Sequence, residues 1–308
     1  MSADQRTKHL VVVTGPTAVG KTQTALRLAG HFQTEVISCD SRQFYSGMQI
    51  GTARPAREEL QGIPHHFLGH LRPEEDYNVS DFEQDALKLL DRLFTDKDMV
   101  IMVGGSGLYI NAVCYGIDDL PDADETLRKD LKKTLDGSGL ATLKEKLREL
   151  DPVYYEQVDL NNPNRIMRAL EVCMVTGRPY SSQRLNKRKE RDFELIMIGL
   201  NMDRQALFKR IHRRTMTMME NGLLEEARSL YAFRHCNSLN TVGYKELFRY
   251  FEGVYTLEQA VEKINTHTRR YAKRQLTWLG KDPDILWFHP KDHSLIEGYI
   301  EKKTRAGA

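Results

Sequence analysis

The sequence predicts an α/β fold in which a doubly wound parallel sheet forms a P-loop-type core and is interrupted by a helical insertion domain. Short apolar runs alternate with amphipathic helical patterns, and a glycine-rich loop follows the first run. The runs are continuous rather than alternating, which indicates strands that helices bury on both faces. The expected strands span residues 10–13, 36–38, 99–103, 195–200 and 285–288.

The glycine-rich loop at residues 15–22 predicts a phosphate site. Gly15 and Gly20 permit backbone conformations that turn amide N–H groups inward, and the following helix adds its positive end. Lys21 supplies a positive charge, and the Thr22 hydroxyl is placed for Mg²⁺. A glycine-rich turn without a ligand is the alternative. The residues expected to bind a di- or triphosphate are Gly15, Pro16, Thr17, Ala18, Val19, Gly20, Lys21 and Thr22.

The chain between residues 119 and 193 is predicted to be a helical insertion domain, because helical patterns occur there without a strand pattern. Asn162 and Pro163 are expected to start one of its helices, which ends at Gly177, since proline favours the first turn of a helix and glycine its end. Residues 1–118 and 194–308 form the predicted catalytic core.

Further helices of the core are expected from their apolar spacing. Ser80 is the predicted N-cap of the first of these, because a serine hydroxyl can accept an amide N–H of the first turn. The expected helices span about residues 80–96, 203–220, 223–233, 244–251 and 257–280.

Composition sets limits on the class of protein. Of 308 residues, 40% are apolar and 29% charged, which is ordinary for a folded globular chain. The net charge of +2 does not by itself indicate nucleic-acid binding, so local clustering must carry that interpretation. The four cysteines lie far apart, which argues against a zinc module or a disulfide scaffold. Without an apolar leader or a membrane-length apolar run, we expect a cytoplasmic protein.

Asp40 follows the second predicted strand and is a candidate general base. In a doubly wound sheet, the residues after neighbouring strands lie at one edge, so we expect Asp40 beside the phosphate loop. A carboxylate there can accept a proton from a substrate. The alternative is a turn-forming Asp whose carboxylate caps the next segment.

The third predicted strand is followed by Gly104, Gly105 and Ser106 rather than by an acidic residue. Kinases, nucleotide hydrolases and diphosphate-releasing transferases share the phosphate loop, but the first two often carry an acidic Mg²⁺ ligand after this strand. Its absence weakens both interpretations. The glycines permit close backbone approach, and Ser106 offers a hydroxyl to a substrate. A plain strand-to-helix turn is the alternative.

Two basic clusters indicate anionic partners. Arg210, Arg213 and Arg214 have helical spacing, so at least two share a face, and a diphosphate or an RNA backbone would offset their repulsion. The basic residues of 269–274 are interleaved with Tyr271 and followed by Trp278, a combination used to bind unpaired nucleic acid. A solvated helix face is the alternative for each cluster.

Taken together, these segments resemble the tRNA dimethylallyltransferases, also called isopentenyl-diphosphate:tRNA transferases. The resemblance runs in order from about residue 10 to residue 288. A C-terminal zinc finger, carried by eukaryotic members, is missing, which suggests the bacterial form. The matching segments are GPTAVGKT (15–22), ISCDS (37–41), GMQIGTARP (47–55), PHH (64–66), VGGSGLY (103–109), NPNRI (162–166), RALEV (168–172), VGYKE (242–246) and KRQLTWL (273–279).

The resemblance implies transfer of a dimethylallyl group from dimethylallyl diphosphate to the N6 amine of the adenine 3′-adjacent to the anticodon in tRNA. Diphosphate is released, and Mg²⁺ is the implied cofactor. Asp40 matches the general base, Thr22 and Arg214 match diphosphate contacts, and Ser106 stands where many members carry Thr. The implied tRNA contacts are Asp40, Ser41, Arg42, Gln43, Ser106, Asn164, Arg165, Ile166, Met167, Arg168, Val242, Gly243, Tyr244, Lys245, Lys273, Arg274, Gln275 and Trp278.

Three alternatives to this function stay open at the level of sequence. An adenylate dimethylallyltransferase would use AMP, ADP or ATP as acceptor, but the basic residues of 269–274 and the insertion favour tRNA. A P-loop small-molecule kinase is disfavoured by the missing acidic residue after the third strand. A non-catalytic RNA-binding module would leave the phosphate loop and Asp40 without a role. We expect the chain to act as a monomer and away from membranes.

Overall fold

The computed structural model describes residues 7–122, 124–185 and 187–306. Its chain forms two compact units, one made of residues up to Cys114 together with those from Arg191 onward, and one of Tyr115–Glu190. The helical insertion expected at residues 119–193 overlaps this second unit over residues 119–190.

A six-stranded parallel sheet forms the centre of the first unit, with the order β3-β2-β4-β1-β5-β6. All five predicted strands are present, and the strand of two residues, β3, was not predicted. The strands are β1 His9–Thr14, β2 Val36–Ser38, β3 His65–His66, β4 Met99–Gly104, β5 Glu194–Leu200 and β6 Leu286–Phe288.

The register of the sheet brings three strand ends together. Thr14 of β1 lies opposite Gly104 of β4, and Ser38 of β2 lies opposite Val103. Because all these strands are parallel, the loops that follow β1, β2 and β4 lie along the same edge. The fold therefore places the phosphate loop, Asp40 and Ser106 at one end of the sheet.

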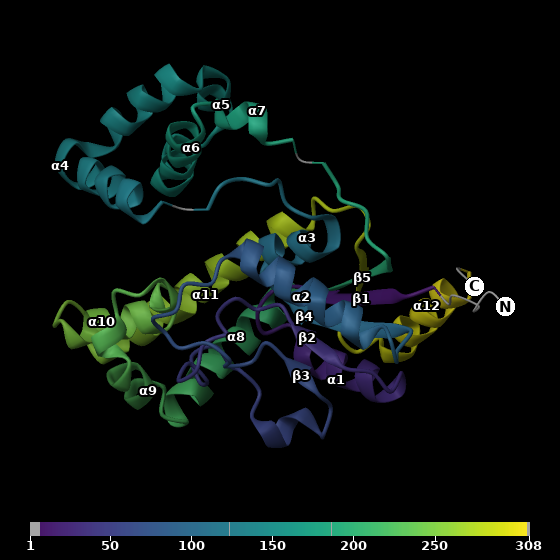
Figure 1. The fold of residues 1–308 in the computed structure, drawn as a ribbon. Helices are drawn as coiled ribbons and strands as arrows, with labels where there is room; N and C mark the ends of the chain where they lie inside the picture. The colour runs from purple at the N-terminus through teal and green to yellow at the C-terminus, as the bar shows by residue number, and fades with distance from the viewer. Residues whose placement is uncertain (1–6, 123, 186, 307–308) are drawn as a thin grey trace. The chain divides into compact units, whose positions relative to one another are not determined.

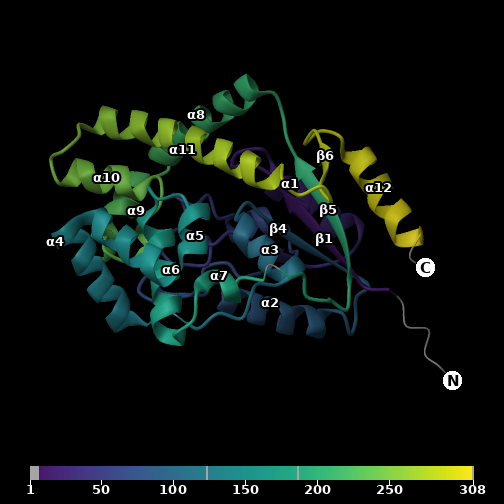
Figure 2. The same cartoon turned by 90° about the horizontal axis from the view of Figure 1, so that it is seen from above.

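Helices cover both faces of the sheet (Figures 1 and 2). Figure 2 shows α2 and α3 on one side of the central strands and α12 on the other. Helices α8 and α11 pack against each other, as do α10 and α11. The helices of this unit are α1 Lys21–His31, α2 Val79–Leu93, α3 Gly107–Tyr115, α8 Arg204–Glu220, α9 Leu223–Ser229, α10 Tyr244–Phe251, α11 Leu257–Leu279 and α12 His293–Ala306.

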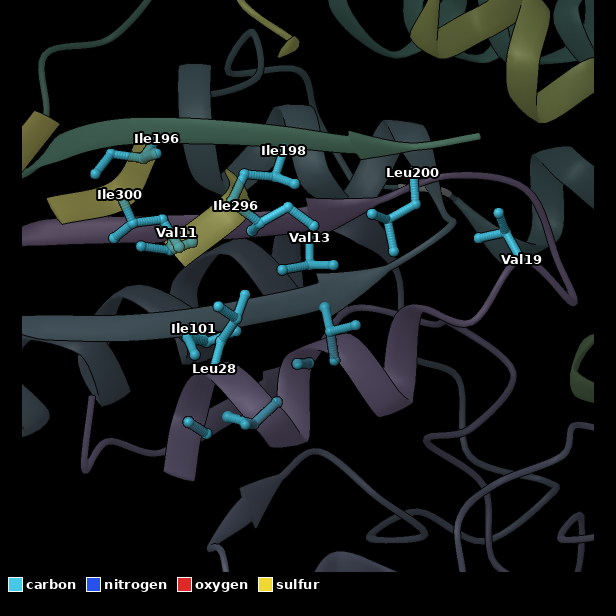
Figure 3. Packing of buried hydrophobic residues seen from close by; sticks show 14 of the residues in the cluster. Val11, Val13, Val19, Leu28, Ile101, Ile196, Ile198, Leu200, Ile296 and Ile300 are labelled. Carbon is cyan, nitrogen blue, oxygen red and sulfur yellow. The ribbon is translucent and has the colours of Figure 1, made fainter. Parts of the chain in front are cut away.

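One face of the sheet packs into an aliphatic core (Figure 3). Val11 and Val13 of β1 and Ile198 of β5 are fully buried there, since alternate residues of a strand point to the same face. Leu28 of α1 and Ile300 of α12 complete the contact from the helices. This core holds the sheet rigid beneath the loops at its edge.

The N-terminus of α2 differs from the expectation. Asn78, not Ser80, is the N-cap, because the Asn78 side-chain oxygen accepts the amides of Ser80 at 2.7 Å and Asp81 at 3.3 Å. The Asp81 carboxylate accepts the Asn78 amide at 2.7 Å in return, which completes a capping box. Elsewhere, the predicted helix at 223–233 is divided, since α9 ends at Ser229 and a 3₁₀ turn follows it.

The second unit is helical, with α4 Glu125–Leu150, α5 Pro152–Gln157, α6 Pro163–Thr176 and α7 Tyr180–Gln183. The expected boundaries of α6 are confirmed: the Asn162 side chain accepts the Arg165 amide at 3.2 Å, and Gly177 ends the helix with a φ of 68°. Leu143 and Ile166 are fully buried in the core of this unit.

Candidate active site

The phosphate loop joins β1 to α1 in a conformation that requires its glycines. Gly15 has a φ of +145°, and a Cβ there would lie 2.4 Å from the Leu200 carbonyl oxygen of β5. Gly20 has a φ of 114° and is the N-cap of α1. A side chain at either position would be strained, so both glycines serve the conformation that the motif predicted.

Lys21 is half-buried against the loop. Its Nζ donates hydrogen bonds to the carbonyl oxygens of Gly15 at 3.1 Å and Pro16 at 2.9 Å. Burial lowers the pKa of Lys21 to about 8, with Asp40 opposing and Arg214 adding to this shift. The ammonium group therefore stands close to both an acidic and a basic partner of the site.

A cavity of about 840 Å³ opens beside the loop and brings together many of the predicted site residues. Within it, a carboxylate, a lysine and guanidinium groups surround space that a diphosphate group could fill. The residues that line it include Thr17, Ala18, Gly20, Lys21, Thr22, Asp40, Gln43, Gln49, Ile50, Arg210, Arg213 and Arg214.

The three arginines of α8 all face this cavity. The half-buried Arg214 guanidinium donates to the Thr52 carbonyl oxygen at 3.3 Å, and desolvation lowers its pKa although Asp40 opposes the shift. Arg210 lies near Gly20, since its Nη2 would be 3.6 Å from a Cβ at that position. The shared face expected from their spacing is therefore turned towards this cavity.

Asp40 both caps the turn that follows β2 and faces the cavity beside the phosphate loop, the two roles that its position in the sequence allowed. Its Oδ1 accepts the Arg42 amide at 3.1 Å, as a capping Asp would. The same residue lines the cavity, and its charge partly offsets the lowering of the pKa that burial causes at Lys21 and Arg214. The carboxylate thus lies among the cations of the site while one oxygen holds its own loop in place.

Ser106 connects the turns after β4 and β2. Its Oγ accepts the Ser41 amide at 3.2 Å and lies 3.3 Å from the Ser41 hydroxyl. Tyr271 of α11 forms a hydrogen bond with Ser106, and burial raises the pKa of this phenol. The hydroxyl predicted to meet a substrate is thus also part of the contact between the two strand ends.

The glycines after β4 allow close packing, as expected. A Cβ at Gly104 would lie 2.0 Å from the Cys39 carbonyl oxygen, and one at Gly105 would lie 2.2 Å from Nε2 of Gln275. A Cβ at Gly107 would lie 2.2 Å from Cδ1 of Trp278. This turn is therefore a surface against which both β2 and α11 rest.

Metal ligands are few at the site. In the described part of the chain, no cluster of three or more His, Cys, Asp or Glu side chains could hold an ion. Thr22, which carries a hydroxyl, is among the residues that line the cavity. Mg²⁺ commonly takes one or two protein ligands and completes its shell with phosphate oxygens and water, so this donor set fits a metal that arrives with a diphosphate.

Four of the predicted tRNA contacts are buried, namely Ile166, Gly243, Tyr244 and Gln275. Ile166 and Tyr244 have no exposed surface and Gln275 is 6% exposed, so these side chains are not available to RNA in this structure. Each of these side chains packs against the core of the unit that contains it. A short motif on a helix contains some residues that face the core and others that face solvent, so not all of its residues can contact RNA. Lys273 and Arg274, by contrast, are exposed on α11.

Other predicted tRNA contacts make bonds within the protein. Arg42 donates to the carbonyl oxygens of Asn237 at 2.7 Å and Ser238 at 3.0 Å. In the second unit, the Arg168 guanidinium lies 3.6 Å from the Glu171 carboxylate, three residues further along α6.

Glu226 was not predicted, although it holds one wall of the cavity. Its carboxylate accepts the amides of Gln49 at 3.0 Å, Ile50 at 2.8 Å and Gly51 at 2.9 Å. Tyr244 donates to the same carboxylate at 2.6 Å. A single Glu near the start of a helix is common in any sequence, so no local signal could have singled it out.

The parallel sheet, the phosphate loop and the cation-lined cavity define this protein as an α/β enzyme of the P-loop class. The chain belongs to the IPP transferase family, whose sequence model matches residues 43–282. This finding confirms the resemblance that the motifs carried.

Relatives with names and solved structures agree with this assignment. tRNA dimethylallyltransferase 1 of Phocaeicola vulgatus is 49% identical over 291 residues, covering 94% of this chain and 97% of that protein. The tRNA isopentenylpyrophosphate transferase of Bacillus halodurans is 39% identical with a TM-score of 0.72, covering 97% and 98%. A eukaryotic dimethylallyltransferase acting on tRNA is 26% identical with a TM-score of 0.79, covering 96% and 77%.

Across the described residues, every helix is too short or too polar to span a bilayer.

Proposed function

We propose that this enzyme transfers a dimethylallyl group from dimethylallyl diphosphate to the N6 amine of the adenine 3′-adjacent to the anticodon in tRNA. The observation that carries the proposal is the single cavity that holds the phosphate loop, Lys21, the arginines of α8 and Asp40. The names of the relatives support the same donor group and acceptor.

The chemistry follows from the charges around the cavity. The adenine amine is a weak nucleophile because its lone pair is delocalised into the ring, so a base that takes its proton assists the attack. Asp40 accepts that proton as the nitrogen–carbon bond forms. The bond between the allylic carbon and the diphosphate oxygen breaks, and its electron pair leaves with the diphosphate. Lys21, Arg214 and the loop amides stabilise the charge that develops there.

A divalent metal is part of the proposal. Mg²⁺ would be held by the Thr22 hydroxyl and by oxygens of the diphosphate, and it would supply further stabilisation of the leaving group. The binding of the diphosphate itself depends on groups of this chain, chiefly Lys21 and Arg214.

The acceptor RNA is assigned to the exposed basic residues of α11. Lys273 and Arg274 are exposed, and Trp278, one turn further, is 40% exposed. Charges beside an aromatic ring suit phosphates and unstacked bases. The target base must leave the stack of its loop to reach a catalytic carboxylate. We assign the enzyme to the cytoplasm, where tRNA is modified, and propose that it acts as a monomer.

One assay separates this function from its alternatives. Labelled dimethylallyl diphosphate is offered with unmodified tRNA, with AMP and with ATP, and the labelled acceptor is identified. Label on tRNA alone is the expected result. Label on AMP or ATP alone would assign an adenylate transferase, and ATP consumption without label transfer would assign a kinase.

A further inference from the structure

Gln275 lies at the centre of the contact between α11 and the phosphate loop. Its side chain is 6% exposed, and both ends of its amide are hydrogen-bonded. Its Oε1 accepts the backbone amide of Thr17 at 2.8 Å, and its Nε2 donates to the Gly105 carbonyl oxygen at 2.9 Å. One side chain thus connects the phosphate loop, the turn after β4 and a helix that follows them by more than 150 residues.

Residues of the turn after β4 and of α11 both fix the position of the Gln275 amide. A Cβ at Gly105 would lie 2.2 Å from Nε2 of Gln275 and 3.3 Å from the Gly15 carbonyl oxygen, so only a glycine leaves room for this amide. On α11, Tyr271 contacts Ser106 and Trp278 covers Gly107, which fixes the helix one turn to either side of Gln275. The amide therefore has a defined position rather than one of many rotamers.

The bond to Thr17 bears directly on anion binding. A phosphate loop works by directing its backbone N–H groups into the cavity, and its conformation depends on which amides are bonded elsewhere. Gln275, which lies outside the loop on α11, accepts the hydrogen bond of the Thr17 amide. Ala18, the next residue, has a φ of 65°, an uncommon value for a residue with a side chain. A loop in this conformation needs support from its surroundings.

We propose that Gln275 is a positioning residue for the diphosphate site, which it serves by holding the phosphate loop in its binding conformation, and that it is not an RNA contact. The proposal rests on the proposed function only in taking a diphosphate as the ligand of the loop. It assigns Gln275 differently from Lys273 and Arg274, its exposed neighbours on the same helix.

Two variants test the proposal from opposite sides. Gln275→Met keeps the length of the side chain but removes both hydrogen bonds, and Gly105→Ala leaves Gln275 in the sequence but displaces its amide. Glu262→Met, at an exposed position of α11, is the matched control. Binding of inorganic diphosphate with Mg²⁺ is measured by calorimetry, binding of an anticodon stem-loop RNA by anisotropy, and folding by thermal unfolding.

We expect both site variants to weaken diphosphate binding about tenfold, which equals 1.4 kcal/mol, while RNA affinity stays within about threefold of the wild type. A third variant, Gln275→Ala, removes the amide altogether. Adding Gly105→Ala to it should weaken diphosphate binding little further than Gln275→Ala alone does, since both changes remove the same contact. The control should match the wild type.

Three outcomes would overturn the proposal. Weaker RNA binding with unchanged diphosphate binding would make Gln275 an RNA contact, as the family resemblance implied. Equal losses of both ligands would indicate a general loss of folded protein, and unchanged binding of both would leave the contact without a role. Because diphosphate binding is measured without turnover, a wild type that fails to label tRNA would overturn the proposed function and leave this result standing.

Discussion

The Tyr244 phenol donates a 2.6 Å hydrogen bond to the Glu226 carboxylate, which also accepts three successive backbone amides. Two of these amides belong to Gln49 and Ile50, which line the cavity. Burial raises the pKa of Tyr244, with Glu226 adding to the shift, so the phenol stays a donor at any physiological pH. A helix outside the sheet thereby sets the position of one wall of the site.

Replacing Glu226 by Gln should loosen this wall. An amide NH₂ would then face a backbone N–H, and leaving a donor unsatisfied costs about 1–3 kcal/mol. We expect lower stability in denaturant unfolding and a higher KM for the donor, with little change in RNA affinity. Glu225→Gln, at the exposed neighbouring position, is the control. Equal behaviour of the two variants would contradict the assignment.

The role of Asp40 is tested best by Asp40→Asn. The amide oxygen can still accept the Arg42 amide, so the turn is kept, but the group can no longer take a proton. We expect the single-turnover rate to fall by roughly 10²–10⁴-fold. RNA binding and the melting temperature should change little. A variant that reacts at the wild-type rate would remove Asp40 from the mechanism.

Donor binding should weaken above about pH 8, the pKa to which burial lowers Lys21. Below this pH the ammonium is charged in the free enzyme and binds the anion directly. Above it, the neutral amine must first take up a proton, because a bound anion favours the charged form, so affinity falls by up to about tenfold per pH unit. Calorimetry in two buffers should detect the proton uptake. Lys21→Arg should lack the fall in this range, and identical profiles would refute the assignment.

RNA binding should depend on the exposed cations of α11. Lys273→Ala and Arg274→Ala should each weaken binding of the anticodon stem-loop and lower the slope of log K against log salt by about one, the effect of losing one phosphate contact. Lys263→Ala, exposed on the same helix, is the control. Slopes equal to that of the control would show that the basic face of α11 is solvated and does not contact the RNA phosphates.

Motifs and periodicity predicted the sheet and the phosphate loop because both depend on local sequence. The continuous apolar run of β4 and the glycines of the loop carry their own signal, whereas β3, with two residues, is too short for any period to be detected. At α2, two residues that can cap a helix lie two positions apart, and Asp81 decided between them by completing a capping box with Asn78.

The contacts of the site could not be predicted in the same way, since they join residues far apart in the chain. Gln275 and Thr17 are separated by 258 positions, and nothing local shows which face of α11 meets the loop. The glycines after β4 were expected to allow close approach, but only the structure identifies Cys39, Gln275 and Trp278 as the groups that approach them.

Arg191 and Glu83 form a buried ion pair at the place where the chain returns to the sheet unit. Their atoms are 2.6 Å apart, with side chains 12% and 8% exposed. Arg191 also donates to the carbonyl oxygens of Val113 at 2.9 Å and Ala112 at 2.7 Å, near the end of α3. The returning chain is thus attached to both α2 and α3.

Removing one partner of this pair should be costly. Glu83→Leu leaves the Arg191 charge buried and unbalanced, and such a change costs about 3–5 kcal/mol. The double variant Glu83→Leu with Arg191→Met removes both charges, so it should unfold at a higher denaturant concentration than the single variant, because a well-packed apolar pair avoids the desolvation penalty. Lys88→Leu, which breaks an exposed pair on α2, should change stability by less than about 1 kcal/mol. A double variant as unstable as the sum of its single changes would show that the two side chains contribute separately, through packing rather than through their charges.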